Sequence, residues 1–258
     1  MAIFKKWFAG RAPAEPADGG PRSIFAILSA WDGTGDPPSI DPVGTGSTAD
    51  VEGKPAPPGQ IDADLFALGR HPGDDEEEAI PILAPFRRAC RSPDDTHFRE
   101  FYEAARVTRL ASCWEPFLER ARGSAGITPA VMRPIGKRLR RQAAHPEPAK
   151  LGILLATALR DGEGLDDVRV LGRHEEFGFW CVQSISALAQ DPVEPVWDLA
   201  RTQKGWGKIH AVRRLAIEAK RRPDVRDWIL RHGCRNTIGA GHLAAVCAAA
   251  GALDEALR

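Results

Sequence analysis

The stretch Asp191–Asn236, DPVEPVWDLARTQKGWGKIHAVRRLAIEAKRRPDVRDWILRHGCRN, predicts three short amphipathic helices in a row. Apolar residues in each helix recur at the i, i+3, i+4 spacing that places them on one face. The three apolar faces consist of Val193, Val196, Trp197 and Ala200; of Ile209, Val212, Ala216 and Ala219; and of Val225, Trp228 and Ile229. The stretch therefore predicts an all-helical protein.

Proline and glycine residues mark where these helices begin and end. Asp191 before Pro192 supplies an N-cap acceptor and a fixed φ for the first helix. The glycines of the segment 204–207 should interrupt the pattern, which places the second helix at Lys208–Lys220. Pro223 opens the third helix, and His232–Gly233 ends it with a basic residue followed by glycine at C′.

A repeat is suggested by two tryptophans, Trp197 and Trp228, which lie 31 positions apart, each in the middle of a short helix. This offset suits a unit of two helices, although HEAT and armadillo units are usually somewhat longer. Helical repeats stack on their neighbours to form a continuous core. The expected fold is therefore a HEAT-like helical repeat, or α-solenoid.

Composition divides the 258-residue chain into three regions. Residues 1–60 are rich in Gly, Pro, Ala and Asp and predict a disordered tail, because little apolar surface offsets the chain entropy. Residues 61–96 form an acidic, Pro-containing transition, and residues 97–258 form the helical repeat domain. One apolar island, Ser23–Leu28, could be a strand, a short helix or a docking peptide. Unless it docks, deleting residues 1–60 should leave thermal unfolding nearly unchanged.

The formal net charge of +0 hides an uneven distribution of charge. Nine acidic residues lie between Asp50 and Glu78, whereas Arg133–Arg141 contains five basic residues and no acid. Such blocks are either solvated surfaces, or a basic binding face together with an acidic segment that competes with the ligand for it. No apolar run is long enough to span a membrane, and the N-terminus lacks a signal-peptide pattern. Together with five widely spaced cysteines and no CxxC pair, this predicts a cytoplasmic protein with free thiols.

Several short motifs resemble functional signatures without their structural context. The segments 44–49 and 239–244 match the spacing of a dinucleotide fingerprint, but no βαβ unit surrounds either. His174-Glu175 begins like a zinc-protease helix, yet position 178 is Gly where a second His is needed. No nucleophile elbow or P-loop occurs, and a carboxylate pair drawn from distant positions stays open. We therefore expect no cofactor and no metal, and we favour a non-enzymatic protein.

One group of residues is the candidate binding face. His210, Arg213 and Arg214 share a polar helix side at i, i+3, i+4. In a stacked array, equivalent sides of successive helices align into a wall, where Arg binds phosphate or carboxylate and Trp offers a stacking surface. The full group is Trp206, Lys208, His210, Arg213, Arg214, Arg231, Arg235 and Asn236. The alternative interpretation is a solvated surface with Trp206 in the core.

The strings Leu171–Phe177 (LGRHEEF), Gly205–His210 (GWGKIH) and Trp228–Asn236 (WILRHGCRN) resemble a family of uncharacterised bacterial proteins. The resemblance covers about residues 95 to 250 and implies an all-helical, HEAT-like body, with no assigned catalytic residue. Some members carry the label limonene hydroxylase, which implies an enzyme. Haem-thiolate hydroxylases need a Cys ligand in a Phe- and Gly-rich loop, and flavin enzymes need a nucleotide fold. The sequence shows neither pattern.

Three functions remain open at this point. The first is a scaffold that binds a protein or peptide on a concave face. The second is nucleic-acid binding, with phosphate contacts from Arg133–Arg141 and from Arg213, Arg214 and Arg235. The third is an enzyme that acts on a small apolar substrate in an apolar cavity. The sequence favours the first.

Overall fold

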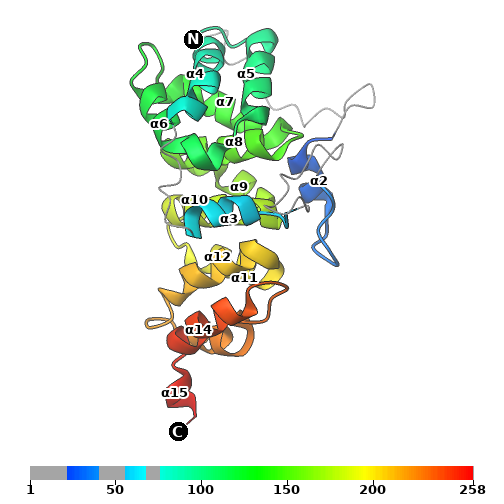
Figure 1. Ribbon diagram of the computed structural model, residues 1–258, viewed down its shortest axis with the longest axis vertical. Helices are drawn as coiled ribbons and strands as arrows, with labels where there is room; N and C mark the ends of the chain where they lie inside the picture. The colour runs from blue at the N-terminus through cyan, green and yellow to red at the C-terminus, as the bar shows by residue number, and fades with distance from the viewer. Residues whose placement is uncertain (1–21, 41–55, 68–75, 258) are drawn as a thin grey trace. The chain divides into compact units, whose positions relative to one another are not determined.

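The computed structural model describes residues 22–40, 56–67 and 76–257. These residues contain helices and no β-strand, so the prediction of an all-helical protein is confirmed for the described part (Figure 1). They form two compact units, the first made of residues 22–32, 38–40 and 76–167, and the second of residues 33–37, 56–67 and 168–257. The tail segments 1–21 and 41–55, predicted to be disordered, lie outside the described residues.

The first unit is a bundle of helices around an aromatic core. Phe86 lies at its centre, with its ring centroid 5.2 Å from those of both Phe101 and Phe117. All three rings are fully buried, and such tilted aromatic pairs stabilise a core beyond simple area burial. The helices of this unit are α2 (Ile24–Ala30), α4 (Glu76–Arg91), α5 (Asp95–Val107), α6 (Leu110–Arg122), α7 (Pro129–Gln142) and α8 (Pro146–Ala158), followed by the 3-10 turn η1 (Gly162–Gly164).

Helix α4 differs from the expectation for the acidic, Pro-containing region. It is a regular helix of 16 residues even though Pro81 and Pro85 lie inside it. Its side toward the core buries Ile82, Phe86 and Ala89 almost completely. We attribute the helix to this burial, which outweighs the lost backbone hydrogen bonds at the two prolines.

The island Ser23–Leu28 forms helix α2 and packs onto α7. The Ser23 hydroxyl caps the helix by accepting a hydrogen bond from the Ala26 N–H, and the Ile24 N–H donates to the Ala143 carbonyl at 2.8 Å. Ile24 and Leu28 are buried completely. This part of the predicted tail is therefore a docked helix, and the structure selects that alternative for the island.

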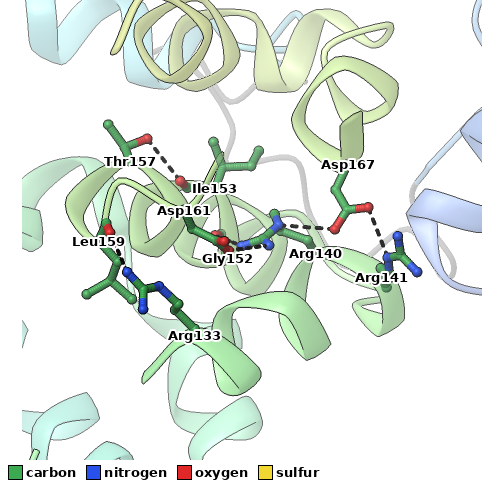
Figure 2. Close-up of polar contacts among 9 residues, drawn as sticks. All are labelled: Arg133, Arg140, Arg141, Gly152, Ile153, Thr157, Leu159, Asp161 and Asp167. Atoms are coloured by element: carbon green, nitrogen blue, oxygen red, sulfur yellow. Dashed lines mark hydrogen bonds and ion pairs between the residues drawn. The ribbon is translucent and has the colours of Figure 1, made fainter. Parts of the chain in front are cut away.

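A buried ion network joins α7 to the middle of α8, to the turn after α8 and to the start of α9, which spans Leu165–Leu171 (Figure 2). Arg140, 2% exposed, donates from Nη2 to Asp161 at 3.0 Å, from Nε to Asp167 at 3.3 Å and from Nη1 to the Gly152 carbonyl at 3.1 Å. Arg141 donates to the second oxygen of Asp167 at 2.9 Å. A buried arginine needs such partners, because an unpaired charge away from water is very costly.

The second unit is built around α12 (Gly205–Ala216), which contacts every other α-helix from α10 to α14. Helices α11 and α12 pack side by side (Figure 1). The other elements of this unit are α3 (Gln60–Ala67), the 3-10 turn η2 (Glu175–Phe177), α10 (Gly178–Leu188), α11 (Val193–Thr202), α13 (Pro223–Trp228), the π-helical turn η3 (Ile229–Gly233), α14 (Ala240–Ala250) and α15 (Leu253–Ala256). Helix α9 (Leu165–Leu171) spans the division between the two units.

The three predicted helices of 191–236 exist, with different ends. Helix α12 begins at Gly205, not at Lys208, so the expectation that the glycines interrupt it is wrong. Gly205 adopts a φ of +57° as the first helical residue, and Gly207 lies where a β-carbon would collide with Gln203. The glycines thus start the helix and allow close packing. The helix also ends earlier, at Ala216, and irregular turns lead to α13.

The end of the third predicted helix also differs from the prediction. Gly233 does not end an α-helix at C′ but lies in the π-helical turn, where a β-carbon would come within 2.6 Å of the Cys247 sulfur. Beyond this turn lie α14 and α15, which are separate helices because the chain turns at Gly251 and at Ala252, which has a φ of +52°.

Candidate binding surface

Helix α12 carries most of the predicted site, but it distributes the residues over two different sides. His210 and Arg214 face α10, whereas Lys208 faces Trp228 of α13. Consecutive residues of a helix are separated by about 100°, so positions 208 and 210 point in widely different directions. The structure therefore does not gather the predicted residues into one continuous face.

On the α10 side, the polar groups are engaged by the protein itself. The His210 ring packs against Phe179 at 5.2 Å and Trp206 at 6.4 Å between centroids. Burial lowers the pKa of His210 to about 4, and the neighbouring Arg213 acts in the same direction. Arg214 donates to the Ser186 hydroxyl at 3.1 Å and to Glu218 at 2.9 Å. Neither His210 nor Arg214 is available as a cationic contact near neutral pH.

Trp206 is half-buried, and its indole Nε1–H has no hydrogen-bond partner among the described residues. Its β-carbon lies close to Gly59, just before α3, where the Gly59 N–H donates to Glu176 at 2.7 Å. Helix α3 is fixed further by the buried hydrogen bond from the Trp180 indole to Asp62, at 2.8 Å. Trp206 is thus partly covered by the chain that leads into α3.

On the opposite side of α12, Lys208 lies next to a pair of tryptophans from neighbouring helices: Trp197 of α11, which is buried, and Trp228 of α13, which is half-buried. Trp197 and Trp228 pack edge to face, with ring centroids 6.1 Å apart. The guanidinium carbon of Arg201 lies 4.9 Å from the Trp197 ring, and Lys208 Nζ lies 5.8 Å from the Trp228 ring. The His232 ring lies 6.2 Å from that of Trp228. We call these five residues the cation–tryptophan cluster.

Arg201, His232 and the tryptophan pair were not among the predicted site residues. The signal was present, since Arg201 follows Trp197 by four positions and His232 follows Trp228 by four. On a helix, residues at this spacing are neighbours. The contact between the two tryptophans depends on how α11 and α13 pack and is not visible in either helix alone.

The remaining four predicted residues differ in their contacts with the rest of the protein. Asn236 is structural: its side-chain amide donates to the carbonyls of Gly205 and Ile238, both at 2.9 Å. Arg213, Arg231 and Arg235 are exposed, and their side chains make no hydrogen bond or ion pair with any described residue. These three arginines are free to contact a partner.

Comparisons with protein-family models, with curated proteins and with solved structures find no match. The interpretation of the cluster therefore rests on its own chemistry. Among residues 22–40, 56–67 and 76–257, no three His, Cys, Asp or Glu side chains converge as a metal site. No helix within these ranges has the length and apolarity needed to cross a membrane. All five cysteines are free, and four of them are buried.

Proposed function

We propose that this chain is a non-enzymatic binding protein with a HEAT-like body, and that its ligand is a segment of another protein. Two features support the repeat. Elements from α10 to α14 contact mainly their close neighbours along the chain, as in a stacked array. Trp197 and Trp228 also contact each other, as expected for equivalent positions in two successive helical repeats.

The observation that carries the binding proposal is the cation–tryptophan cluster. Tryptophan and arginine are the residue types that dominate binding energy at protein interfaces, because they combine large apolar area with polar donors. In this cluster the Trp228 ring lies next to Lys208, whose charge attracts an anionic partner, whereas Arg201 over the Trp197 ring is already paired with Asp198. A peptide with acidic and apolar side chains matches this chemistry.

The strongly shifted histidines fit a structural role. His174 is 7% exposed, and its Nδ1 accepts the N–H of Glu176, so this nitrogen carries no proton. Burial lowers the pKa of His174 to about 4. Burial also raises the pKa of the Cys181 thiol well above its usual range. Each shift has burial as its largest cause, which is typical of packed core groups.

A peptide-display selection on the full chain tests the proposal. We expect enriched peptides that compete with one another for one site and lose affinity when Trp228 is replaced by alanine. The exposed Ile217, replaced by alanine, is the matched control in the same unit and should leave binding unchanged. Failure to enrich any peptide over a bare-support control would contradict the proposal.

Nucleic-acid binding is a second candidate, favoured by the free guanidinium groups of Arg213, Arg231 and Arg235. The other predicted source of phosphate contacts is the segment Arg133–Arg141, and most of its arginines bond to other residues of the first unit. There Arg133 donates to the Leu159 carbonyl, Arg138 pairs with Asp95, and Arg140 and Arg141 belong to the buried network. Fluorescence anisotropy with labelled DNA at low and physiological salt tests this candidate. Steep salt dependence that weakens in an Arg213→Ala/Arg231→Ala variant would support it.

A further inference from the structure

Lys208 is a half-buried cation without an anionic partner. Its side chain makes no hydrogen bond or ion pair with any described residue, and its ammonium lies over the Trp228 ring. Burial lowers the pKa of Lys208, and the like charge of Arg235 adds to this effect, although Cys247 and Cys234 oppose it. An unpaired, partly desolvated ammonium next to a second cation is unfavourable in the free protein.

The second cation is held in place by the fold. Arg235 precedes Asn236, whose amide is anchored to the Gly205 carbonyl in the first turn of α12. The Gly205 N–H donates in turn to the Thr237 hydroxyl at 3.2 Å. These two bonds fix the segment that carries Arg235 against the start of the helix that carries Lys208. The backbone that carries Arg235 is therefore fixed at the first turn of α12, next to the turn that carries Lys208.

Most acidic groups of this region already have cationic partners. Asp198 pairs with Arg201 at 2.5 Å, and Glu218 pairs with Arg214 at 2.9 Å. Arg222 binds both Glu194 and Asp224, at 2.8 and 2.7 Å. The stretch 201–236 contains eleven Lys and Arg but only three Asp and Glu. The charges of Lys208 and Arg235 are thus left to an anion from outside the chain.

We propose that Lys208 and Arg235, next to the half-buried Trp228, form an anion site for the carboxylate of a partner peptide. This inference rests on the proposed function and adds the chemistry of the ligand. The guanidinium of Arg235 provides planar donors that match a carboxylate, and the ammonium of Lys208 provides a point charge. Binding would relieve the repulsion between the two cations.

The arrangement fits a peptide better than a nucleic acid. Bases need an aromatic face on which to stack, but the Trp228 ring is already contacted by Trp197, His232 and Lys208. A peptide needs to place only one carboxylate at the two cations and does not require a free aromatic face.

Fluorescence anisotropy with labelled peptides and the full chain tests the site. The probes are a peptide of alternating Glu and Leu, a Gln–Leu peptide of the same length, and a single-stranded oligonucleotide of the same charge as the first. We expect the Glu–Leu peptide to bind most tightly, and less tightly in high salt. Lys208→Gln and Arg235→Gln should each weaken binding by about tenfold.

Two controls make the test specific. Lys220→Gln removes the same charge from an exposed lysine in the turn after α12 and should change affinity by no more than about twofold. Lys208→Arg keeps the charge and should retain binding. If the Lys208→Gln variant fails to fold, the Arg235→Gln variant, at an exposed position, is compared with Lys220→Gln in its place. Equal weakening by Lys220→Gln, or equal binding of the Glu–Leu and Gln–Leu peptides, overturns the site.

The outcomes separate this inference from the proposed function. Display peptides that bind the chain equally well with and without Arg235→Gln would leave the scaffold proposal standing and overturn the carboxylate site. An oligonucleotide that binds more tightly than the Glu–Leu peptide, and depends on Lys208, would overturn the assignment to a peptide. Loss of affinity restricted to the Lys208 and Arg235 variants supports it.

Discussion

A β-carbon on Gly178 would overlap the Cα atom of Gly207, so α10 and α12 meet backbone to backbone at these two glycines. The contact brings the start of α10 against the first turn of the helix that organises the second unit. Neither glycine has a positive φ, so neither is required here for a left-handed conformation. Their role is the close approach itself.

Gly178→Ala should therefore destabilise the protein, by about 1–3 kcal/mol, because the helices must separate to admit a methyl group. Urea unfolding followed by circular dichroism measures this change. Gly241→Ala is the matched control in the same unit, since a β-carbon there meets no atom within 4 Å. A similar loss for both variants would show that helix packing at Gly178 is not the cause.

Arg140→Met should destabilise the first unit by about 3–5 kcal/mol, since it leaves Asp161 without its partner and Asp167 with only Arg141. The measurement is the free energy of unfolding in urea. Arg106→Met provides a control on an exposed pair, because Arg106 bonds Glu103 on the surface of α5. That variant should lose less than about 1 kcal/mol.

The sequence was sufficient to predict what depends on local periodicity. Val196, Ile209 and Val225 are buried as the spacing of the three helices predicted. It was not sufficient where a distant segment determines the structure. The glycines of α12 were taken as interruptions because their packing partners, Glu175 for Gly205 and Gly178 for Gly207, lie about thirty positions earlier.

The candidate site shows the same limit. A helix position predicts which residues share a side, and His210 and Arg214 do lie toward one neighbour, α10. Which side is occupied by other elements depends on tertiary packing, so the sequence could not show that Arg214 is engaged by Ser186. For the same reason it placed Lys208 and His210 in one group, although they face different helices.

Leu28→Ala should lower the free energy of unfolding by about 2–4 kcal/mol, because it removes a fully buried side chain of α2 and leaves a cavity. Leu257→Ala, at a side chain that is 78% exposed, is the matched control and should have little effect. Deleting residues 1–60 should likewise lower stability, which replaces the expectation of an unchanged transition. An unaltered melting temperature after the deletion would mean that α2 contributes nothing in solution.

Acidification should destabilise the protein through its two buried histidines. Burial lowers the pKa of His210 from 6.5 to about 4, so the unfolded chain takes up this proton at a higher pH than the folded protein does. The contribution of neutral, buried His210 to the free energy of unfolding is therefore complete above pH 6.5 and is lost as the pH falls toward 4. Its size is up to roughly 3 kcal/mol for each such histidine. His174, with a pKa of about 4, contributes in the same direction.

His210→Phe isolates one of the two contributions, because phenylalanine keeps an aromatic ring against Phe179 and Trp206 but does not titrate. Between pH 6.5 and 4, the free energy of unfolding should fall less steeply in this variant than in the unmodified protein. Urea unfolding across this pH range provides both slopes, and carboxylate effects cancel in the difference. Phe179→Leu, which disturbs the same packing without removing a titratable group, should leave the slope unchanged. Parallel slopes for His210→Phe and the unmodified protein would show that His210 is not buried in its neutral form.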